Sequence, residues 1–395
     1  MGLALTKLEF SDFRNYRHLR LDGLGPLTVF VGPNAAGKTN IVEGIQLLTA
    51  QSSFRNPTVS QMVREGAPCA RLDAWAQDGS RDLQLTVQME AGRTRRLLNG
   101  KAKRAADLRG IVPSVAFTPD DLDLARSASS VKRDAVDALG SQLSAPHHRL
   151  RADYEKALRG KNRLLKDEAP DALLDSADEV LVMVGAQLTC YRAALFARLA
   201  EAMAESYGRI AGGCERLSAS YAPSWAEHDP ARFAPCPPPS RDEARERMWH
   251  ALAVRRAEER ARHRAVVGPH ADHLDFFIDG RNAAVFGSQG QKRSLVLAFK
   301  LAETALIEDM LDQKPVLLLD DVMGELDARR RAALMQAVAG DLQTFITATN
   351  LDYFDAELLS AARVLQVPFA EENAETRPQT AVDEEIVKKA DDRRS

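Results

Sequence analysis

The eight residues Gly32–Thr39, which read Gly-Pro-Asn-Ala-Ala-Gly-Lys-Thr, constrain the fold of this chain more than any other stretch. They follow the strand-like run Leu27–Val31 and precede Thr39–Thr49, where apolar residues recur at helical spacing. A glycine-rich loop between a strand and a helix aims its backbone N–H groups, and the positive end of the helix, at phosphate oxygens. The order of strand, loop and helix therefore predicts a phosphate-binding loop in an α/β fold.

Two side chains at the end of this loop have predicted roles in binding ATP. Lys38 is placed to reach the β- and γ-phosphates, and Thr39 is placed to bind Mg²⁺ through its hydroxyl. The alternative is a chance glycine-rich turn, which the flanking strand and helix make the poorer explanation. The residues predicted to line the nucleotide here are Gly32, Pro33, Asn34, Ala35, Ala36, Gly37, Lys38, Thr39 and Asn40.

A second apolar run, Val316–Leu319, ends in two carboxylates, Asp320 and Asp321. At the end of a buried strand, Asp320 is the expected Mg²⁺ partner, directly or through a water molecule. Asp321 is then placed to act as general base toward the attacking water, so Asp321 and Lys38 are the predicted catalytic residues. Two solvated acids at a strand end are the alternative. Asp327, in the Gly-Glu-Leu-Asp stretch that follows, is also expected near the nucleotide.

The sequence Ser-Gln-Gly-Gln at Ser288–Gln291 opens an apolar helix. Alone it is short, and a serine helix cap is a fair alternative explanation. Together with the phosphate loop and the two carboxylates, it is typical of the signature loop of ABC-type ATPases. In that architecture Ser288, Gly290 and Gln291 face the γ-phosphate of a nucleotide held by another copy. We therefore expect an ATP-dependent homodimer.

The rest of the chain predicts an ABC-type ATPase head interrupted by a helical lobe. Strands dominate the first hundred residues, with hairpin turns at Asp78-Gly79 and Asn99-Gly100, so an antiparallel layer is expected beside the mixed sheet of the phosphate loop. Long charged helices follow, and apolar strands return after Val266. The predicted fold is α/β, with the head at 1–120 and 265–369, a mainly helical lobe at 121–264, and a disordered charged tail at 370–395.

The bulk properties of the chain limit its function. The net charge is −3, so nucleic-acid binding must depend on a local basic patch. No window approaches 18 uninterrupted apolar residues, and the first ten residues lack the pattern of a secretory signal, so no membrane span or export is expected. Four scattered cysteines without metal-binding spacing are typical of a reduced cytoplasmic protein.

Two basic clusters are candidate contacts to DNA. Around the Asn99-Gly100 turn, the predicted contacts to the phosphate backbone are Arg95, Arg96, Lys101 and Lys103. The second cluster lies at 255–264 and is interleaved with acids, so a solvated helix face explains it better.

One further group of residues suggests a metal site: His270, Asp272, His273 and Asp275. Alternation along a strand turns Asp272 and His273 to opposite faces. A structural junction between lobes is therefore the preferred interpretation.

Several motifs outside the ATPase pattern occur along the chain: Asp12–Tyr16, Asn40 with Glu43, Ser53–Arg55, Phe117–Leu122 and Gly268–His270. From the N-terminus to about Phe369, this sequence resembles the RecF family of recombination and replication-repair proteins, relatives of the SMC chromosome proteins. The resemblance implies that Arg14, Asn15 and Asn40 lie at the nucleotide.

The same resemblance implies a cytoplasmic protein that binds DNA in an ATP-dependent manner and prefers gapped or single-strand/double-strand junction DNA. It implies partnership with the RecO and RecR proteins in loading the RecA recombinase. ATP and Mg²⁺ are the implied cofactors. The expected activity is a weak DNA-stimulated ATPase that acts as a switch, with hydrolysis releasing the DNA.

The sequence departs from related patterns at three places. After Gly268–His270 the family usually has an arginine and two aspartates, whereas this chain has Ala271, Asp272 and His273, so the ion pair of that arginine is expected to be missing. The stretch 347–350 is Thr-Ala-Thr-Asn where many ABC ATPases have a histidine, so γ-phosphate sensing is expected to be weaker or differently made. No glutamine stands in Phe117–Leu122.

Three other functions remain as alternatives. A transporter ATPase is disfavoured because some 250 residues separate Lys38 from Ser288. An SMC-like ATPase subunit of a nuclease or another DNA-processing complex would need an additional acidic metal cluster or a fused nuclease domain. A structural scaffold would not need a complete nucleotide site.

Overall fold

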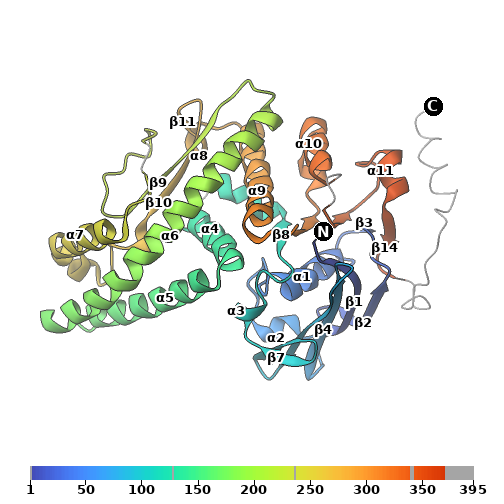
Figure 1. Cartoon of the computed structure of the whole chain (residues 1–395), viewed down its shortest axis with the longest axis horizontal. Coiled ribbons are helices and arrows are strands. Elements are labelled where there is room, and N and C mark those ends of the chain that lie inside the picture. The colour runs from blue at the N-terminus through green and yellow to red at the C-terminus, as the bar shows by residue number, and fades with distance from the viewer. Residues whose placement is uncertain (1, 127–128, 235–236, 339–341, 370–395) are drawn as a thin grey trace. The chain divides into compact units, whose positions relative to one another are not determined.

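The computed structural model describes residues 2–126, 129–234, 237–338 and 342–369. The chain divides into two compact units. The first unit comprises Met1–Pro119 and Ile307–Ser395, and the second comprises Asp120–Leu306 (Figure 1). The tail predicted at 370–395 lies outside the described residues.

The first unit contains a five-stranded sheet in which all neighbouring strands are parallel. Its order is β14-β3-β13-β12-β8. The three central strands are buried along their whole length, as expected for parallel strands covered on both faces. The strands are β3 (Leu27–Val31), β8 (Ser114–Phe117), β12 (Val316–Asp320), β13 (Thr344–Ala348) and β14 (Arg363–Gln366).

A six-stranded antiparallel sheet forms the second layer of this unit, in the order β2-β1-β4-β5-β6-β7. Both predicted hairpin turns are confirmed: residues 78–81 join β4 to β5, and Asn99-Gly100 joins β6 to β7 with positive φ at both residues. The strands are β1 (Ala4–Phe13), β2 (Tyr16–Asp22), β4 (Cys69–Gln77), β5 (Asp82–Glu90), β6 (Arg93–Leu98) and β7 (Lys101–Lys103).

Helix α1 (Lys38–Thr49) packs closely on the antiparallel layer and brings the phosphate loop to it. A Cβ atom at Gly44 would lie 2.5 Å from the ring of Phe10, so the glycine allows the helix to approach the sheet this closely. Ile41, Val42 and Ile45 on the same helix are fully buried. Short helices complete the unit: α2 (Val59–Met62), α3 (Ala105–Leu108), α10 (Ala328–Val338) and α11 (Ala356–Ala361).

Long helices and a small sheet make up the second unit. The three-stranded antiparallel sheet has the order β11-β10-β9. The strands are β9 (Leu217–Ala222), β10 (His273–Ile278) and β11 (Arg281–Asn282). The helices are α4 (Ser129–Leu143), α5 (Ala145–Lys166), α6 (Asp171–Ala211), α7 (Arg241–Arg262), α8 (Ala283–Phe286) and α9 (Gln289–Leu311), the last of which ends in the first unit.

This division differs from the one expected from sequence. The run that begins at Leu274 was expected to return to the sheet of the phosphate loop, but as β10 it pairs with β9. The expectation was wrong because β9, a short strand in a region that reads as helical, was not anticipated. Residues 265–306 therefore belong to the second unit rather than to the head.

Helix α6 is the central helix of the second unit. By length and composition alone, part of it could cross a membrane, although polar residues interrupt its apolar sequence. However, 56% of that part is buried inside the protein. Arg192 on α6 is also buried and binds Asp137 of α4 through two hydrogen bonds of 2.9 and 2.8 Å. A buried core helix explains the apolar composition.

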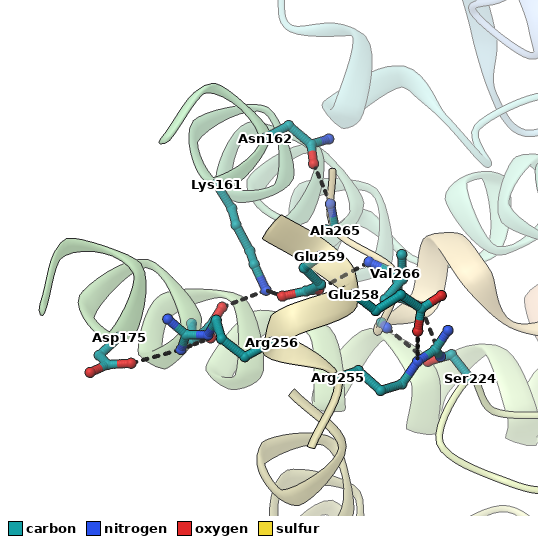
Figure 2. Close-up of polar contacts among 12 residues, drawn as sticks. Lys161, Asn162, Asp175, Ser224, Arg255, Arg256, Glu258, Glu259, Ala265 and Val266 are labelled. Atoms are coloured by element: carbon teal, nitrogen blue, oxygen red, sulfur yellow. Dashed lines mark hydrogen bonds and ion pairs between the residues drawn. The ribbon is translucent and has the colours of Figure 1, made fainter. Parts of the chain in front are cut away.

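A buried group of charges ties α5, α6 and α7 together (Figure 2). Lys161 of α5 lies 2.6 Å from Asp178 of α6 and 2.6 Å from Glu259 of α7. Arg256 of α7 binds Asp178 as well, at 2.8 Å. The second oxygen of Glu259 accepts a hydrogen bond from the backbone N–H of Val266, which anchors the chain beyond α7. Opposite charges compensate one another here, as burial requires.

We predict that Lys161→Met destabilises the protein by about 3–5 kcal/mol, because it removes the cation that pairs with buried Glu259 and leaves buried Asp178 with Arg256 alone. The measurement is the free energy of unfolding of the second unit in urea. The matched control is Lys166→Met on the same helix, where the side chain is exposed, and we expect a change within about 0.5 kcal/mol. Equal losses in both variants would contradict the assigned role.

Candidate nucleotide-binding site

The phosphate loop leaves β3 at Val31 and enters α1 at Lys38, and its first and last glycines are both required by the backbone. A Cβ at Gly32 would lie 1.8 Å from the carbonyl oxygen of Val367. Gly37 has φ of 105°, in the region that favours glycine, and a Cβ there would lie 2.5 Å from the side chain of Asn15. The loop therefore packs against Val367, just after β14, on one side and against the Asp12–Tyr16 motif on the other.

Lys38 folds back into its own loop. Its ammonium group donates hydrogen bonds to the carbonyl oxygens of Gly32 and Pro33, at 2.7 and 2.9 Å. The side chain is buried, with 6% of the residue exposed. A lysine ammonium has three donors, so one remains available to a phosphate oxygen at the centre of the loop.

Asp320, at the end of β12, is held by two hydroxyl groups. Thr39 at the start of α1 donates to its Oδ1 at 2.9 Å, and Thr347 at the end of β13 donates to the same atom at 2.8 Å. Asp320 and Thr347 are register partners of neighbouring parallel strands. Burial raises the pKa of the Asp320 carboxyl, and the two hydroxyl donors oppose this shift. The site thus brings the two predicted Mg²⁺ ligands, Thr39 and Asp320, into direct contact.

Thr347 is the residue that sequence reasoning missed. From the sequence, the stretch 347–350 was notable only for lacking the histidine that many ABC ATPases have there. In the structure its hydroxyl donates to Asp320 and also accepts a hydrogen bond from the backbone N–H of Asp321, at 2.9 Å. One hydroxyl group therefore positions both carboxylates. The feature of the sequence that could have identified Thr347 is its place at the end of the strand next to β12.

Asp321 follows β12 in an unusual conformation. Its φ is 54°, a left-handed value that is uncommon for residues other than glycine. Burial raises the pKa of its carboxyl, while the charge of Lys38 lowers it. Asp321 is thus held near Lys38, next to Asp320, at the carboxyl end of the parallel sheet.

Arg14 and Glu43 fasten the Asp12–Tyr16 turn to α1. Glu43 is fully buried, and Arg14 binds it through two hydrogen bonds of 2.9 and 2.7 Å. Ser53 donates to the same carboxylate at 2.7 Å. Arg14 was predicted to contact the nucleotide, but its guanidinium is engaged with Glu43 and with the carbonyl oxygen of Gln61. The motif residues therefore form a buried polar clamp beside the loop.

Asn15 and Asn40, which were both predicted to lie at the nucleotide, are adjacent in the structure. The amide of Asn40 donates to the side-chain oxygen of Asn15 at 2.7 Å. They share an open pocket beside the phosphate loop, whose lining comprises Arg14, Asn15, Asn40, Ser60, Gln61, Val63, Arg64 and Glu65. The nearby Tyr16 hydroxyl is buried and has no hydrogen-bond partner among the described residues.

The predicted signature residues lie in the second unit, at the start of α9. Ser288 and Gln291 form a reciprocal cap: the N–H of Gln291 donates to the Ser288 hydroxyl, and the N–H of Ser288 donates to the Gln291 side chain. Gln291 also donates to Glu215 at 2.9 Å. Because the Ser288 oxygen accepts in this cap, its own O–H remains able to donate to an anion. Gly290 adds no side chain to this helix start.

Asp327 is engaged in local structure. Its carboxylate accepts a hydrogen bond from the backbone N–H of Arg330 at 3.0 Å and pairs with the Arg330 side chain. It therefore caps the start of α10.

The predicted DNA-contacting cations are divided between two faces of the β6–β7 hairpin. Residues paired across antiparallel strands share a face, and Arg96 pairs with Lys103 while Leu98 pairs with Lys101. Arg96, Lys101 and Lys103 therefore share one face, and Arg95 lies on the other. Arg96 is half-buried and donates to Gln51 at 3.0 Å, whereas Lys101 and Lys103 are exposed.

The group that suggested a metal site has structural partners instead. Asp272 is fully buried, pairs with Arg192 at 3.7 Å, and accepts hydrogen bonds from Tyr221 and from the N–H of Ser224. His270 is hydrogen-bonded to the Tyr154 hydroxyl, and burial lowers the pKa of His270 to about 4. Arg192 thus supplies from α6 an ion pair that was expected to be missing here.

Comparisons with known proteins agree with this geometry. The family model described as the RecF/RecN/SMC N terminal domain matches residues 4–374. The protein from Synechococcus sp. strain JA-3-3Ab named DNA replication and repair protein RecF is 36% identical over 92% of this chain and 96% of its own length. The RecF protein from Synechocystis sp. strain PCC 6803 is 35% identical over 92% of this chain and 96% of its own length.

Solved structures give the same result. The recombination mediator protein RecF-ATPrS in the RecFOR pathway superposes with a TM-score of 0.82 and 26% identity, over 90% of this chain and 94% of that one. The corresponding RecF-ATP structure has a TM-score of 0.80 and 27% identity, over the same shares of the two chains. An Smc head domain from Pyrococcus furiosus, at 14% identity and a TM-score of 0.53, covers 100% of both chains and shares the fold.

The phosphate loop, the carboxylates at the end of β12 and the capped serine of α9 define an ABC-type, SMC-like ATPase that binds ATP. The family match spans almost the whole described chain, and the identity to the curated relatives exceeds 30% over most of their length. The chain belongs to the RecF family and is a RecF-type DNA repair ATPase.

We predict that Asp320→Asn stabilises the nucleotide-free protein by roughly 2–4 °C in melting temperature while abolishing stabilisation by Mg²⁺ and ATP. A buried carboxyl with a raised pKa disfavours folding once it ionises, and this cost grows as the pH rises through its titration. The gain over wild type should therefore be full at pH 8 and should shrink as the pH falls toward about 4, the ordinary pKa of an aspartate. Asp153→Asn, at an exposed position of α5, serves as control. A melting temperature that falls at pH 8 would contradict the electrostatic account.

Proposed function

We propose that this protein is an ATP-controlled DNA-binding switch of recombinational repair and replication restart. Two copies close on ATP, bind gapped or single-strand/double-strand junction DNA, and promote recombinase loading; hydrolysis releases the DNA. The observation that carries this proposal is the contact among Thr39, Asp320 and Thr347, which builds a nucleotide site at the ends of two parallel strands.

The donor set fits Mg²⁺ with ATP. The Thr39 hydroxyl and the Asp320 carboxylate are hard oxygen ligands, the class that Mg²⁺ prefers. When bound, the ion would neutralise charge on the β- and γ-phosphates. Lys38 would hold the same phosphates from inside the loop. Asp321 would accept a hydrogen bond from the attacking water, because its raised pKa and its place beside Lys38 suit a general base.

The nucleoside would lie in the pocket of Asn15 and Asn40, which adjoins the loop. The unpartnered Tyr16 hydroxyl is buried close to Gly37, at the end of the phosphate loop. Ser288 and Gly290 would meet the γ-phosphate of the second copy, because the O–H of Ser288 is free to donate and α9 presents its positive end. Asp327 and Gln291 would support this contact through the structure that they cap.

Partners of the RecO and RecR type, and a cytoplasmic location, follow from the family rather than from the site. The similar solved structures are described as a recombination mediator in the RecFOR pathway. An SMC-like subunit of a nuclease complex would need a nuclease metal centre. Among the described residues, no group of three or more His, Cys, Asp or Glu side chains could hold a metal ion.

We expect Asp321→Asn to separate binding from hydrolysis. The substitution keeps the size of the side chain but removes the proton acceptor, which typically costs about 10²–10⁴-fold in rate. The variant should accumulate as an ATP-bound dimer in sedimentation and should hold gapped DNA longer than wild type does. Lys38→Met, which loses phosphate contacts, should show neither property. Release of DNA by Asp321→Asn at the wild-type rate would rule out hydrolysis as the release step.

The hairpin is the proposed DNA contact, and its two faces can be tested separately. Lys101→Gln with Lys103→Gln should weaken DNA binding and reduce the log–log salt slope by about 0.9 for each lost phosphate contact. Arg93→Gln with Arg95→Gln is the matched control on the opposite face, where Arg93 pairs across the ladder with Glu90. The reverse result would place the DNA on the other face, and unchanged slopes in both would remove the hairpin from the contact.

A further inference from the structure

Two adjacent apolar side chains are exposed next to the signature serine. Val285 is 70% exposed and Phe286 is 63% exposed. With Val254, at 67%, they are the most exposed of the large apolar residues in the part of the chain that the structure describes. Single exposed apolar residues are ordinary, but a neighbouring pair with this exposure indicates a surface that is covered in some state of the protein.

The backbone that carries the pair is fixed. Asn282 caps α8 through the N–H of Ala284 at 2.9 Å and anchors it through the carbonyl oxygen of Pro230 at 2.8 Å. Lys292 of α9 donates to the carbonyl oxygen of Ala284 at 2.9 Å. A Cβ at Gly287 would lie 2.5 Å from the carbonyl oxygen of Ala283, so the turn into Ser288 is tight. The backbone of the two residues is therefore held in one position relative to Ser288.

We propose that Val285 and Phe286 pack against a second copy of this chain and form the apolar contact that holds the ATP-bound dimer closed. The inference rests on the proposed function, in which Ser288 meets the nucleotide of the other copy. Phe286 is only two residues from Ser288, which is at most about 7 Å of chain. A phosphate loop that brings its γ-phosphate to Ser288 must therefore come within reach of Phe286.

The phosphate loop offers a matching surface. Pro33 and Ala35, at its crest, are both exposed and apolar. A contact made only by Ser288 and Gly290 would be polar and small, whereas lasting interfaces have an apolar, often aromatic, centre. In a twofold dimer the pair is used twice, so its effect on the stability of the dimer is doubled.

The test compares Val285→Ser/Phe286→Ser with Val254→Ser, a control valine on α7 of nearly equal exposure. Dimer dissociation constants are measured by sedimentation equilibrium with Mg²⁺ and a slowly hydrolysed ATP analogue. We expect a roughly 10- to 100-fold weaker dimer for the double variant and no change for the control. The affinity of dilute monomer for the nucleotide should stay within about twofold of wild type, and Phe286→Leu should retain the dimer.

Three other results would contradict the apolar contact, and they are distinguishable from one another. If Ser288→Arg abolishes the dimer but the double serine variant dimerises as wild type does, the apolar contact is wrong and the shared site stands. If wild type stays monomeric with the nucleotide, both this inference and the proposed dimer are wrong. If Phe286→Leu is as weak as the double variant, packing of an apolar side chain is not the cause.

Discussion

The hydroxyl of Thr347 is the contact on which the nucleotide site depends. It donates to Asp320 at 2.8 Å and accepts from the N–H of Asp321 at 2.9 Å, so it fixes the ends of β12 and β13 relative to each other. Asp320 in turn receives the hydroxyl of Thr39, which fixes the first turn of α1. Three segments far apart in the sequence thus converge on one buried carboxylate. Its raised pKa is the electrostatic cost of holding a metal ligand ready in a buried place.

A second polar contact keeps the phosphate loop against the antiparallel layer. Glu43 on α1 is fully buried, and Arg14 and Ser53 satisfy its carboxylate. The turn that carries Arg14 therefore lies directly beside Gly37, where a larger residue would collide with Asn15. Residues that resemble a family signature in the sequence thus have a plain structural role: they clamp the loop and shape the adjoining pocket.

Local patterns made much of this site predictable. The loop of Gly32–Thr39 lies between a strand and a helix, as the spacing of its neighbours indicated, and Asp320 ends a buried strand. The role of Thr347 could not be predicted, because it depends on the register of two strands separated by more than twenty residues. The strand Leu217–Ala222 was missed because its serine-rich pattern lies among long helices, and with it the true sheet of β10 was missed. Arg95 and Arg96 lie on opposite faces of the β6–β7 hairpin because side chains alternate along a strand, and this could have been predicted from the sequence.

The central claim is that one nucleotide site is shared by two copies, and mixing two inactive variants tests it most directly. Lys38→Met lacks a working phosphate loop, and Ser288→Arg lacks a working signature loop. In a mixed dimer the phosphate loop of the second variant faces the signature loop of the first, so one complete site forms. The account predicts that the mixture forms heterodimers with ATP and hydrolyses it, although neither variant does so alone. A mixture no more active than the sum of its two components would contradict it.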